Sequence, residues 1–267
     1  MASSLALHIE RREFKYLIDE YTAERVRRFI EPFCTLDKNA RHNDDRRYVI
    51  DSLYFDTPDM RLYWANDDEV TDRFKLRVRT YPETPGAPVF FEVKARYHDV
   101  VVKDRGRAPK NWPELLAHGS GAIAPQRSSF ESAAVERFTA LVRMQHARPV
   151  VLVRYTREPY ESTIDDYARV TFDRAIKSQQ MDTISMTPTP GRWRASDAGE
   201  RMTTGFSPTV LELKFTTNVP VWMVDMVRAL NLDRRAFSKY GRSVEAWAEY
   251  PDGRRTLNHR AAPGWSR

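Results

Sequence analysis

Polar and apolar residues alternate with a period of two over much of this chain. Such alternation places successive side chains on opposite faces and is typical of a β-strand. It predicts strands over residues 8–18, 48–55, 73–81, 89–96, 100–107, 149–157, 168–173 and 209–215. Because few helical segments separate these strands, we expect an antiparallel sheet that curls or closes on itself.

Three segments instead repeat their apolar residues every three to four positions, the spacing of a helix with one buried face. The first covers residues 22–33, with Thr22 as its cap and Pro32 disturbing its last turn. The second covers residues 130–143, and the third begins at Pro220, whose fixed φ suits a first helical position. We expect helices on the outside of the sheet, in an α+β fold built as an antiparallel β-barrel or tunnel.

The regions outside these elements are rich in residues that favour turns. Residues 188–208 contain many Pro, Gly, Ser and Thr, and we expect a mobile loop there. The polar, basic tail over residues 251–267 is expected to fray. No internal repeat divides the chain, so we expect one domain over residues 1–250.

The composition limits the class of protein. The chain has 267 residues, of which 41% are hydrophobic and 12% aromatic, and this excludes disorder over most of its length. Its apolar runs, such as residues 150–153, are too short for a transmembrane helix, and its first residues do not resemble a signal peptide. The single cysteine, Cys34, excludes a disulfide framework. We therefore expect a cytoplasmic protein without a membrane segment of its own.

The placement of charge is more informative than its total. A net charge of +6, from 43 Lys and Arg against 37 Asp and Glu, suits nucleic acid, nucleotides or polyphosphate equally well. Residues 73–79 read RFKLRVR, so all their basic side chains share one face of the predicted strand. Similar ionic faces recur over residues 11–15, 91–96, 103–107, 169–173 and 211–215.

Two arrangements of the sheet explain these ionic faces. In the ordinary one, the charged faces point to water and the apolar faces meet in a sandwich. Like charges on neighbouring strands repel one another, however, and basic residues outnumber acidic ones on these faces. In the other arrangement, the sheet curls around a concave face lined with Lys and Arg. A bound polyanion together with a divalent metal then completes the charge balance.

Short motifs follow one another along residues 10–247 in an order typical of one family. They are RREFKY at 11–16, SLYFDT at 52–57, KLRVRTY at 75–81, FEVK at 91–94, RPVV at 148–151, YTR at 155–157, RVTFD at 169–173, LELK at 211–214 and SKY at 238–240. This ordered set resembles the VTC domain, the polyphosphate polymerase domain of the vacuolar transporter chaperone complex and its bacterial relatives. That family belongs to the triphosphate tunnel metalloenzymes, with the CYTH adenylate cyclases and thiamine triphosphatases.

The resemblance implies a triphosphate tunnel fold, whose basic walls grip ATP while its γ-phosphate passes to a growing polyphosphate chain. The catalytic residues that it implies are Lys15, Arg77, Arg79, Lys94, Arg157, Arg169 and Lys239. The further substrate-binding residues are Lys75, Lys103, Arg105 and Lys214. For a metal, Mn²⁺ or Mg²⁺, Glu212 matches the family's metal-binding glutamate, and Glu13 and Glu92 are second candidates.

One position departs from the wider superfamily. The CYTH branch begins with Glu-x-Glu-x-Lys, and here Arg11 stands at the first glutamate, which favours the polymerase branch. Lys75 lies further out on its strand and is expected at the tunnel mouth. Arg157 shares strand parity with Val151 and Val153, so a bulge or strand end is expected to bring it inside.

Several functions therefore compete. The leading hypothesis is a metal-dependent polyphosphate polymerase whose partners are ATP and polyphosphate, with a separate membrane protein as one candidate partner. The alternatives are a triphosphatase for inorganic or nucleoside triphosphates and a polyphosphate sensor without catalysis. A nucleic-acid binder is disfavoured because Phe74, Phe91 and Phe172 point away from the basic faces. A P-loop kinase is disfavoured because its glycine loop is absent.

Overall fold

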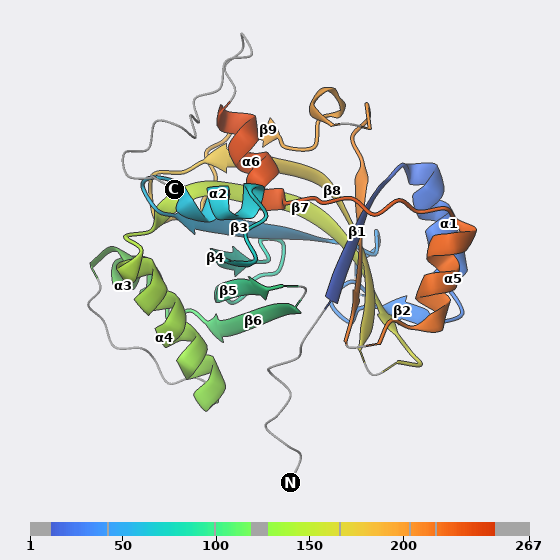
Figure 1. Cartoon of the computed structure of the whole chain (residues 1–267). Helices are drawn as coiled ribbons and strands as arrows, with labels where there is room; N and C mark the ends of the chain where they lie inside the picture. Colours follow the sequence, from blue (N-terminus) through green and yellow to red (C-terminus); the bar gives the residue numbers. More distant parts are fainter. Residues whose placement is uncertain are drawn as a thin grey trace.

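The structure is a computed structural model that describes residues 12–41, 43–98, 100–118, 128–165, 167–202, 204–216 and 218–248. Strands and helices are mixed along the chain (Figure 1). In chain order they are β1 (Arg12–Ile18), α1 (Glu20–Ile30), β2 (Cys34–Leu36), β3 (Tyr48–Asp56), α2 (Arg61–Asp67), β4 (Asp72–Thr80), β5 (Phe90–Tyr97), β6 (Val100–Arg107), α3 (Trp112–His118), α4 (Ser129–Met144), β7 (Arg148–Ser162), β8 (Ala168–Gln180), β9 (Arg194–Ala195), η1 (Gly199–Arg201), β10 (Thr209–Phe215), α5 (Val221–Ala229) and α6 (Lys239–Ala248).

The strands form one antiparallel sheet, which confirms the predicted α+β fold class. Its order is β1-β10-β8-β7-β3-β4-β5-β6, with β2 added to β7 and β9 added to β8. The sheet curls until β5 and β1, near its two ends, are joined by an ion pair between Lys94 and Glu13, with Nζ and Oε2 2.7 Å apart. No strand pairing closes the ring among the described residues, so the sheet forms an open tunnel with two facing walls.

Two long strands connect the walls. β7 and β8 extend beyond the predicted residues 149–157 and 168–173, reaching Ser162 and Gln180. Their register shifts between Arg154 and Thr156, and Ala175 on β8 has a φ of 49°. An extra residue of this kind is a β-bulge, which bends a strand and increases its twist. The bend lets the same two strands belong to both walls.

Helices cover the outer faces of the sheet, as predicted (Figure 1). Helices α1 and α5 pack on the outer side of β1, β10 and β8, around Val170, Leu211 and Met226. Helices α3 and α4 pack on the outer side of β3, β4 and β5, around Phe91 and Phe138. Burial of such apolar side chains stabilises each wall from outside and leaves its inner face to polar residues.

The observed helices begin and end at slightly different residues from those predicted, because of their capping residues. Helix α1 begins before the predicted residue 22, because Asp19 rather than Thr22 supplies the cap: its Oδ1 accepts a hydrogen bond from the Thr22 amide at 2.7 Å. The helix ends at Ile30, ahead of Pro32. Helix α4 spans almost the predicted residues 130–143, and α5 starts after Pro220, which is its cap instead of its first residue.

Helix α6 contradicts the expectation that helices lie only outside. Its Tyr240 and Val244 pack with Tyr54 of β3 and Val153 of β7. Tyr54 lies directly opposite Arg77 on β4, so this apolar cluster is on the inner face of the sheet. The helix therefore fills one end of the concave surface, and the face lined with Lys and Arg that strand parity predicted is limited to the remainder.

The segment predicted as a mobile loop over residues 188–208 is fixed to the sheet in its middle. β9 pairs with β8, and the Ser196 amide donates to the Ile176 carbonyl at 2.8 Å. The Asp197 carboxylate accepts a hydrogen bond from the Ile176 amide at 2.9 Å. Turn-forming composition did not reveal these buried contacts. Residues 8–11 and the tail at 251–267 lie outside the described residues.

Candidate functional site

Two buried carboxylates organise the inner face, one on each wall. We call the first group the Glu92 cluster, on β4, β5 and β6, and it consists of Glu92, Arg77, Arg79, Lys103 and Arg105. The second is the Glu212 cluster, on β7, β8, β10 and α6, and it consists of Glu212, Asp173, Arg157, Lys214 and Lys239. These clusters bring together most of the residues that the family resemblance implied.

In the Glu92 cluster, one carboxylate meets basic side chains from both neighbouring strands. Glu92 is fully buried, and its oxygens lie 2.7 Å from Arg77 Nε and 2.7 Å from Lys103 Nζ. Arg79 and Arg105 follow at 3.7 and 3.5 Å. Burial alone would raise the pKa of Glu92, but the surrounding cations hold that pKa well below its usual value. The carboxylate therefore stays ionised and acts as a fixed counter-charge.

Two tyrosine hydroxyls extend this cluster toward β3 and β7. Arg77 Nη1 donates to Tyr54 Oη at 3.2 Å, and Arg79 Nη2 donates to Tyr155 Oη at 3.2 Å. The Tyr54 ring stacks on Tyr240 of α6, with ring centroids 4.9 Å apart. Strand parity could have placed both tyrosines on the inner face, but it gave no sign of the helix that packs on them.

In the Glu212 cluster, two carboxylates share their basic partners. Glu212 contacts Lys214 Nζ at 2.6 Å, Lys239 Nζ at 2.8 Å and Arg157 Nη2 at 3.2 Å. Asp173 accepts two hydrogen bonds of 2.7 Å from Arg157 and lies 2.6 Å from Lys239 Nζ. Burial alone would lower the pKa of Lys239, but Asp173 and Glu212 raise it above its usual value. Lys239 is therefore a permanent cation at the start of α6.

Arg157 reaches the interior without the predicted displacement. On β7, Val151, Val153 and Arg157 all lie on one face, which is the inner face, since Val153 is directly opposite Ser52 and Arg157 opposite Tyr48 on β3. The two valines pack under α6 instead of facing outward. The bulge between Arg154 and Thr156 has its extra residue on β8, and the alternation of β7 is unbroken from Val151 to Arg157. The expectation that a bulge or strand end must turn Arg157 inward was therefore wrong. Its premise, that inner positions are polar, fails beneath α6.

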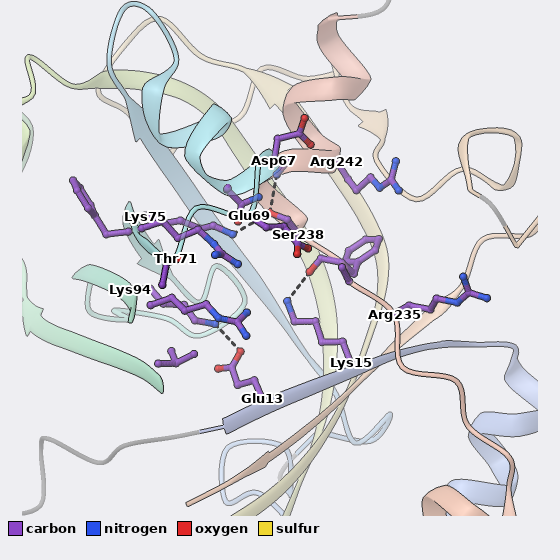
Figure 2. Close-up of a pocket in the computed structure, with 18 of the residues that line it drawn as sticks. Glu13, Lys15, Asp67, Glu69, Thr71, Lys75, Lys94, Arg235, Ser238 and Arg242 are labelled. Carbon is purple, nitrogen blue, oxygen red and sulfur yellow. Dashed lines mark hydrogen bonds and ion pairs between the residues drawn. The ribbon is translucent and has the colours of Figure 1, made fainter. Parts of the chain in front are cut away.

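The open mouth of the tunnel is a cavity of about 930 Å³ (Figure 2). Its walls come from β1, β4, β5 and β6, from α2 and the segment after it, and from α6 and the segment before it. Lys15, Lys75 and Lys94 point into it, and the ion pair of Lys94 with Glu13 lies at its edge. Burial alone would raise the pKa of Glu13, yet Lys94 and other lysines hold it below its usual value. This acid is ionised and already engaged.

Lys15 and Lys75 have mostly neutral partners at this mouth. Lys15 Nζ donates to the Phe237 carbonyl at 2.6 Å and lies 4.0 Å from Glu212. Lys75 Nζ donates to Ser238 Oγ at 3.0 Å. Burial lowers the pKa of Lys15 to about 8, and burial together with neighbouring cations lowers that of Lys75 well below its usual value. A bound anion would relieve both groups. Lys75 lies in the wall of the mouth cavity, where the sequence placed it.

Arg169 is separate from both clusters. It lies opposite Lys214 in the strand register, yet its side chain is 44% exposed and pairs with Glu161 at 2.5 Å. Its side chain therefore lies at the rim, outside both clusters. Ser238 and the Phe237 carbonyl, by contrast, were not singled out from sequence, because backbone carbonyls and capping hydroxyls leave no pattern at this level.

The predicted Mn²⁺ or Mg²⁺ does not match the acids as they are arranged. Divalent cations of this kind prefer oxygen ligands that converge on one point. Within the described ranges, no three His, Cys, Asp or Glu side chains come together to hold a metal ion. Glu212, Glu92 and Glu13 each contact an ammonium or guanidinium group within 2.8 Å. A cation placed at any of them would face existing positive charge.

These features define an α+β protein with an open tunnel whose inner face carries more basic than acidic side chains. The sequence profile of the VTC domain matches residues 10–248, and the chain belongs to this family. A search of curated proteins found no match. No described helix is long and apolar enough to cross a membrane.

Solved structures of similar fold are distant. One is a putative adenylate cyclase from Bacillus halodurans, at 12% identity and a TM-score of 0.49, covering 87% of this chain and 94% of that one. The PH1819 protein from Pyrococcus horikoshii OT3 has 11% identity and a TM-score of 0.43, with coverages of 86% and 96%. The Mimivirus capping enzyme triphosphatase has 10% identity and a TM-score of 0.33, with coverages of 84% and 87%. Because these TM-scores are low, the description of the fold rests on the sheet topology of this structure.

Proposed function

We propose that this protein is a polyphosphate polymerase that transfers the γ-phosphate of ATP to the end of a polyphosphate chain in its tunnel. The observation that carries the proposal is the inner face itself. Basic residues from both walls, from the mouth and from α6 converge there, and they belong to the motifs by which the sequence resembles the family. Their number exceeds that of the inner acids, so the tunnel favours a ligand with several negative charges.

The chemistry asks little of the protein beyond position and charge. An oxygen of the terminal phosphate of the chain attacks the γ-phosphorus, and the bond from that phosphorus to the β–γ bridging oxygen breaks, releasing ADP. Arg77, Arg79 and Arg157 are suited to hold equatorial oxygens through paired N–H groups, while Lys15 and Lys239 act as point charges. The attacking phosphate is already anionic, so no general base is required.

The state of the inner acids supports transfer to phosphate over transfer to water. A triphosphatase orients its attacking water with a carboxylate. Here Glu13, Glu92, Asp173 and Glu212 are each engaged by a lysine or arginine among the described residues. An acceptor phosphate is negatively charged and can draw these cations away from the carboxylates, whereas a neutral water molecule cannot. The expected metal stays a prediction.

A gel assay tests the proposal. The protein is incubated with ATP and Mn²⁺, and the products are separated beside a polyphosphate standard, with Glu212→Ala as the control. We expect a ladder of chains from the wild type and none from the variant. Phosphate release without polymer would favour a triphosphatase. Binding of polyphosphate with neither product, and no effect of Glu212→Ala on that binding, would favour a sensor.

A further inference from the structure

The wall made of β4, β5 and β6 carries its inner charges in rows, because directly opposite residues of neighbouring strands lie side by side. Lys75 is opposite Lys94, and Lys94 is opposite Lys103. One step closer to the mouth, Arg73 is opposite Arg96. Successive rows are two residues apart, which is about 7 Å along a strand. We call the Arg73–Arg96 pair the outer row.

The outer row is a pair of like charges held facing the cavity. Both arginines line the mouth. Arg73 Nη1 donates to the Val70 carbonyl at 2.5 Å, and Arg96 Nε donates to the His98 carbonyl at 2.9 Å, so backbone groups fix both side chains. Burial and the neighbouring Arg96 lower the pKa of Arg73, and Glu69 offsets this only in part. Facing like charges destabilise a sheet unless an anion lies between them.

The length of the wall shows which anion would use this row. From Arg73 to Arg79 the strand spans about 20 Å. Three phosphates that share bridging oxygens are shorter than this. A triphosphate held by the deeper rows and the Glu212 cluster would leave the outer row without a phosphate. The cavity continues outward to Arg73 and Arg96, and a longer chain would follow it.

Resting on the proposed function, we propose that Arg73 and Arg96 form an outer subsite for the later phosphates of a linear chain. This subsite makes the protein prefer polyphosphate to tripolyphosphate and holds the chain between successive additions. It acts on binding of the chain and takes no part in bond formation. The residues were not among those that the family motifs select.

Calorimetric titration tests this with two probes, sodium tripolyphosphate and a size-fractionated linear polyphosphate, with concentrations counted per chain. The proteins are the wild type, the double variant Arg73→Gln/Arg96→Gln, and a control that loses the same charge from the outer face of α1, Arg25→Gln/Arg28→Gln. We expect the wild type and control to bind polyphosphate about tenfold more tightly than tripolyphosphate, a gain consistent with one or two charged hydrogen bonds. We expect the outer-row variant to lose that gain and keep its tripolyphosphate affinity within about twofold.

The outer-row variant distinguishes a gain in affinity that comes from direct contact with the arginines from a gain due only to the larger number of binding registers of a longer chain. A longer chain can bind in more registers, and that gain would persist in Arg73→Gln/Arg96→Gln, which would overturn the proposal. An equal loss for both probes would also overturn it, since the row would then act on all anions. Arg73→Lys/Arg96→Lys, which keeps the charge, should retain most of the preference. If the wild type binds tripolyphosphate but gains nothing from length, this inference fails alone; if it binds neither, the proposed function fails as well.

Discussion

Glu92 and Glu212 are both buried carboxylates surrounded by cations, but their partners come from different parts of the chain. The partners of Glu92 lie on β4 and β6, the strands on either side of its own, so they are close in sequence. The partners of Glu212 come from β1, β7 and α6 as well as from its own strand. The first cluster therefore holds one wall together, whereas the second ties distant segments of the fold to each other.

The difference has an energetic consequence. Removing charges from water is costly, and a buried ion pair offsets that cost only when its partners are well placed. In the Glu92 cluster the sheet register itself places the partners. In the Glu212 cluster their placement depends on α6 docking, because Lys239 enters the tunnel from that helix. We therefore expect the Glu212 cluster to be the more sensitive of the two to a single change.

The largest effect is expected from Lys239→Ala. This change leaves both Asp173 and Glu212 without their shared ammonium, and breaking a buried ion pair typically costs about 3–5 kcal/mol. Urea unfolding measures the loss, and polymer synthesis should stop. Lys38→Ala, at an exposed position, is the control. A loss below about 1 kcal/mol would mean that α6 docks independently of this charge.

Glu212→Gln and Glu92→Gln sharpen the comparison at the level of binding. Each variant removes one negative charge that competes with a phosphate for the same cations. We expect tripolyphosphate to bind about tenfold more tightly to Glu212→Gln, because its cations surround the tunnel centre, and polymer synthesis to be lost. Glu92→Gln should lower the free energy of unfolding by about 2 kcal/mol, since its wall loses an internal counter-charge. Weaker tripolyphosphate binding by Glu212→Gln would show that this acid helps to bind the ligand.

Addition and chelation of a divalent metal test whether either cluster binds a metal ion in the absence of phosphate. The carboxylates are already paired with cations, so titration of Mn²⁺ alone, followed by the paramagnetic resonance signal of the free ion, should show no stoichiometric binding. Tripolyphosphate should still bind in the presence of EDTA. Tight binding of Mn²⁺ to the protein without phosphate, lost in Glu212→Gln but not in Glu92→Gln, would contradict this.

The smallest effect concerns pH and Lys15. Its pKa in the folded protein is about 8 against an ordinary 10.5, so above pH 8 the folded state loses a proton that the unfolded state keeps. Because the unfolded state then binds more protons, this residue makes stability rise with pH between those values. Anion affinity should fall over the same range by severalfold, as the ammonium loses its charge. Lys15→Gln should flatten both dependences, with calorimetry and urea unfolding as the measurements.

The pattern of the sequence predicted much of the fold, and its motifs named most of the residues that the structure brings together on the inner face, for identifiable reasons. Strand parity depends on nothing but the chain, so the alternation over residues 73–79 and 211–215 correctly placed Arg77, Arg79 and Glu212 on one face. Ordered motifs then located Lys239, which no periodicity would have marked. Short helices such as α2 and α6 were missed, since a few residues give no clear period.

What the sequence determined by itself is the list of charged groups and the strand face on which each lies, because side-chain direction in a strand follows from local backbone geometry. What only the tertiary structure decided is how those groups neutralise one another. The pairing of Lys239 with Asp173 and Glu212, the burial of Val153 under α6, and the Lys15 contact to the Phe237 carbonyl join residues far apart in the chain. Such pairings depend on how the sheet curls and where the last helix docks, and no local pattern encodes that.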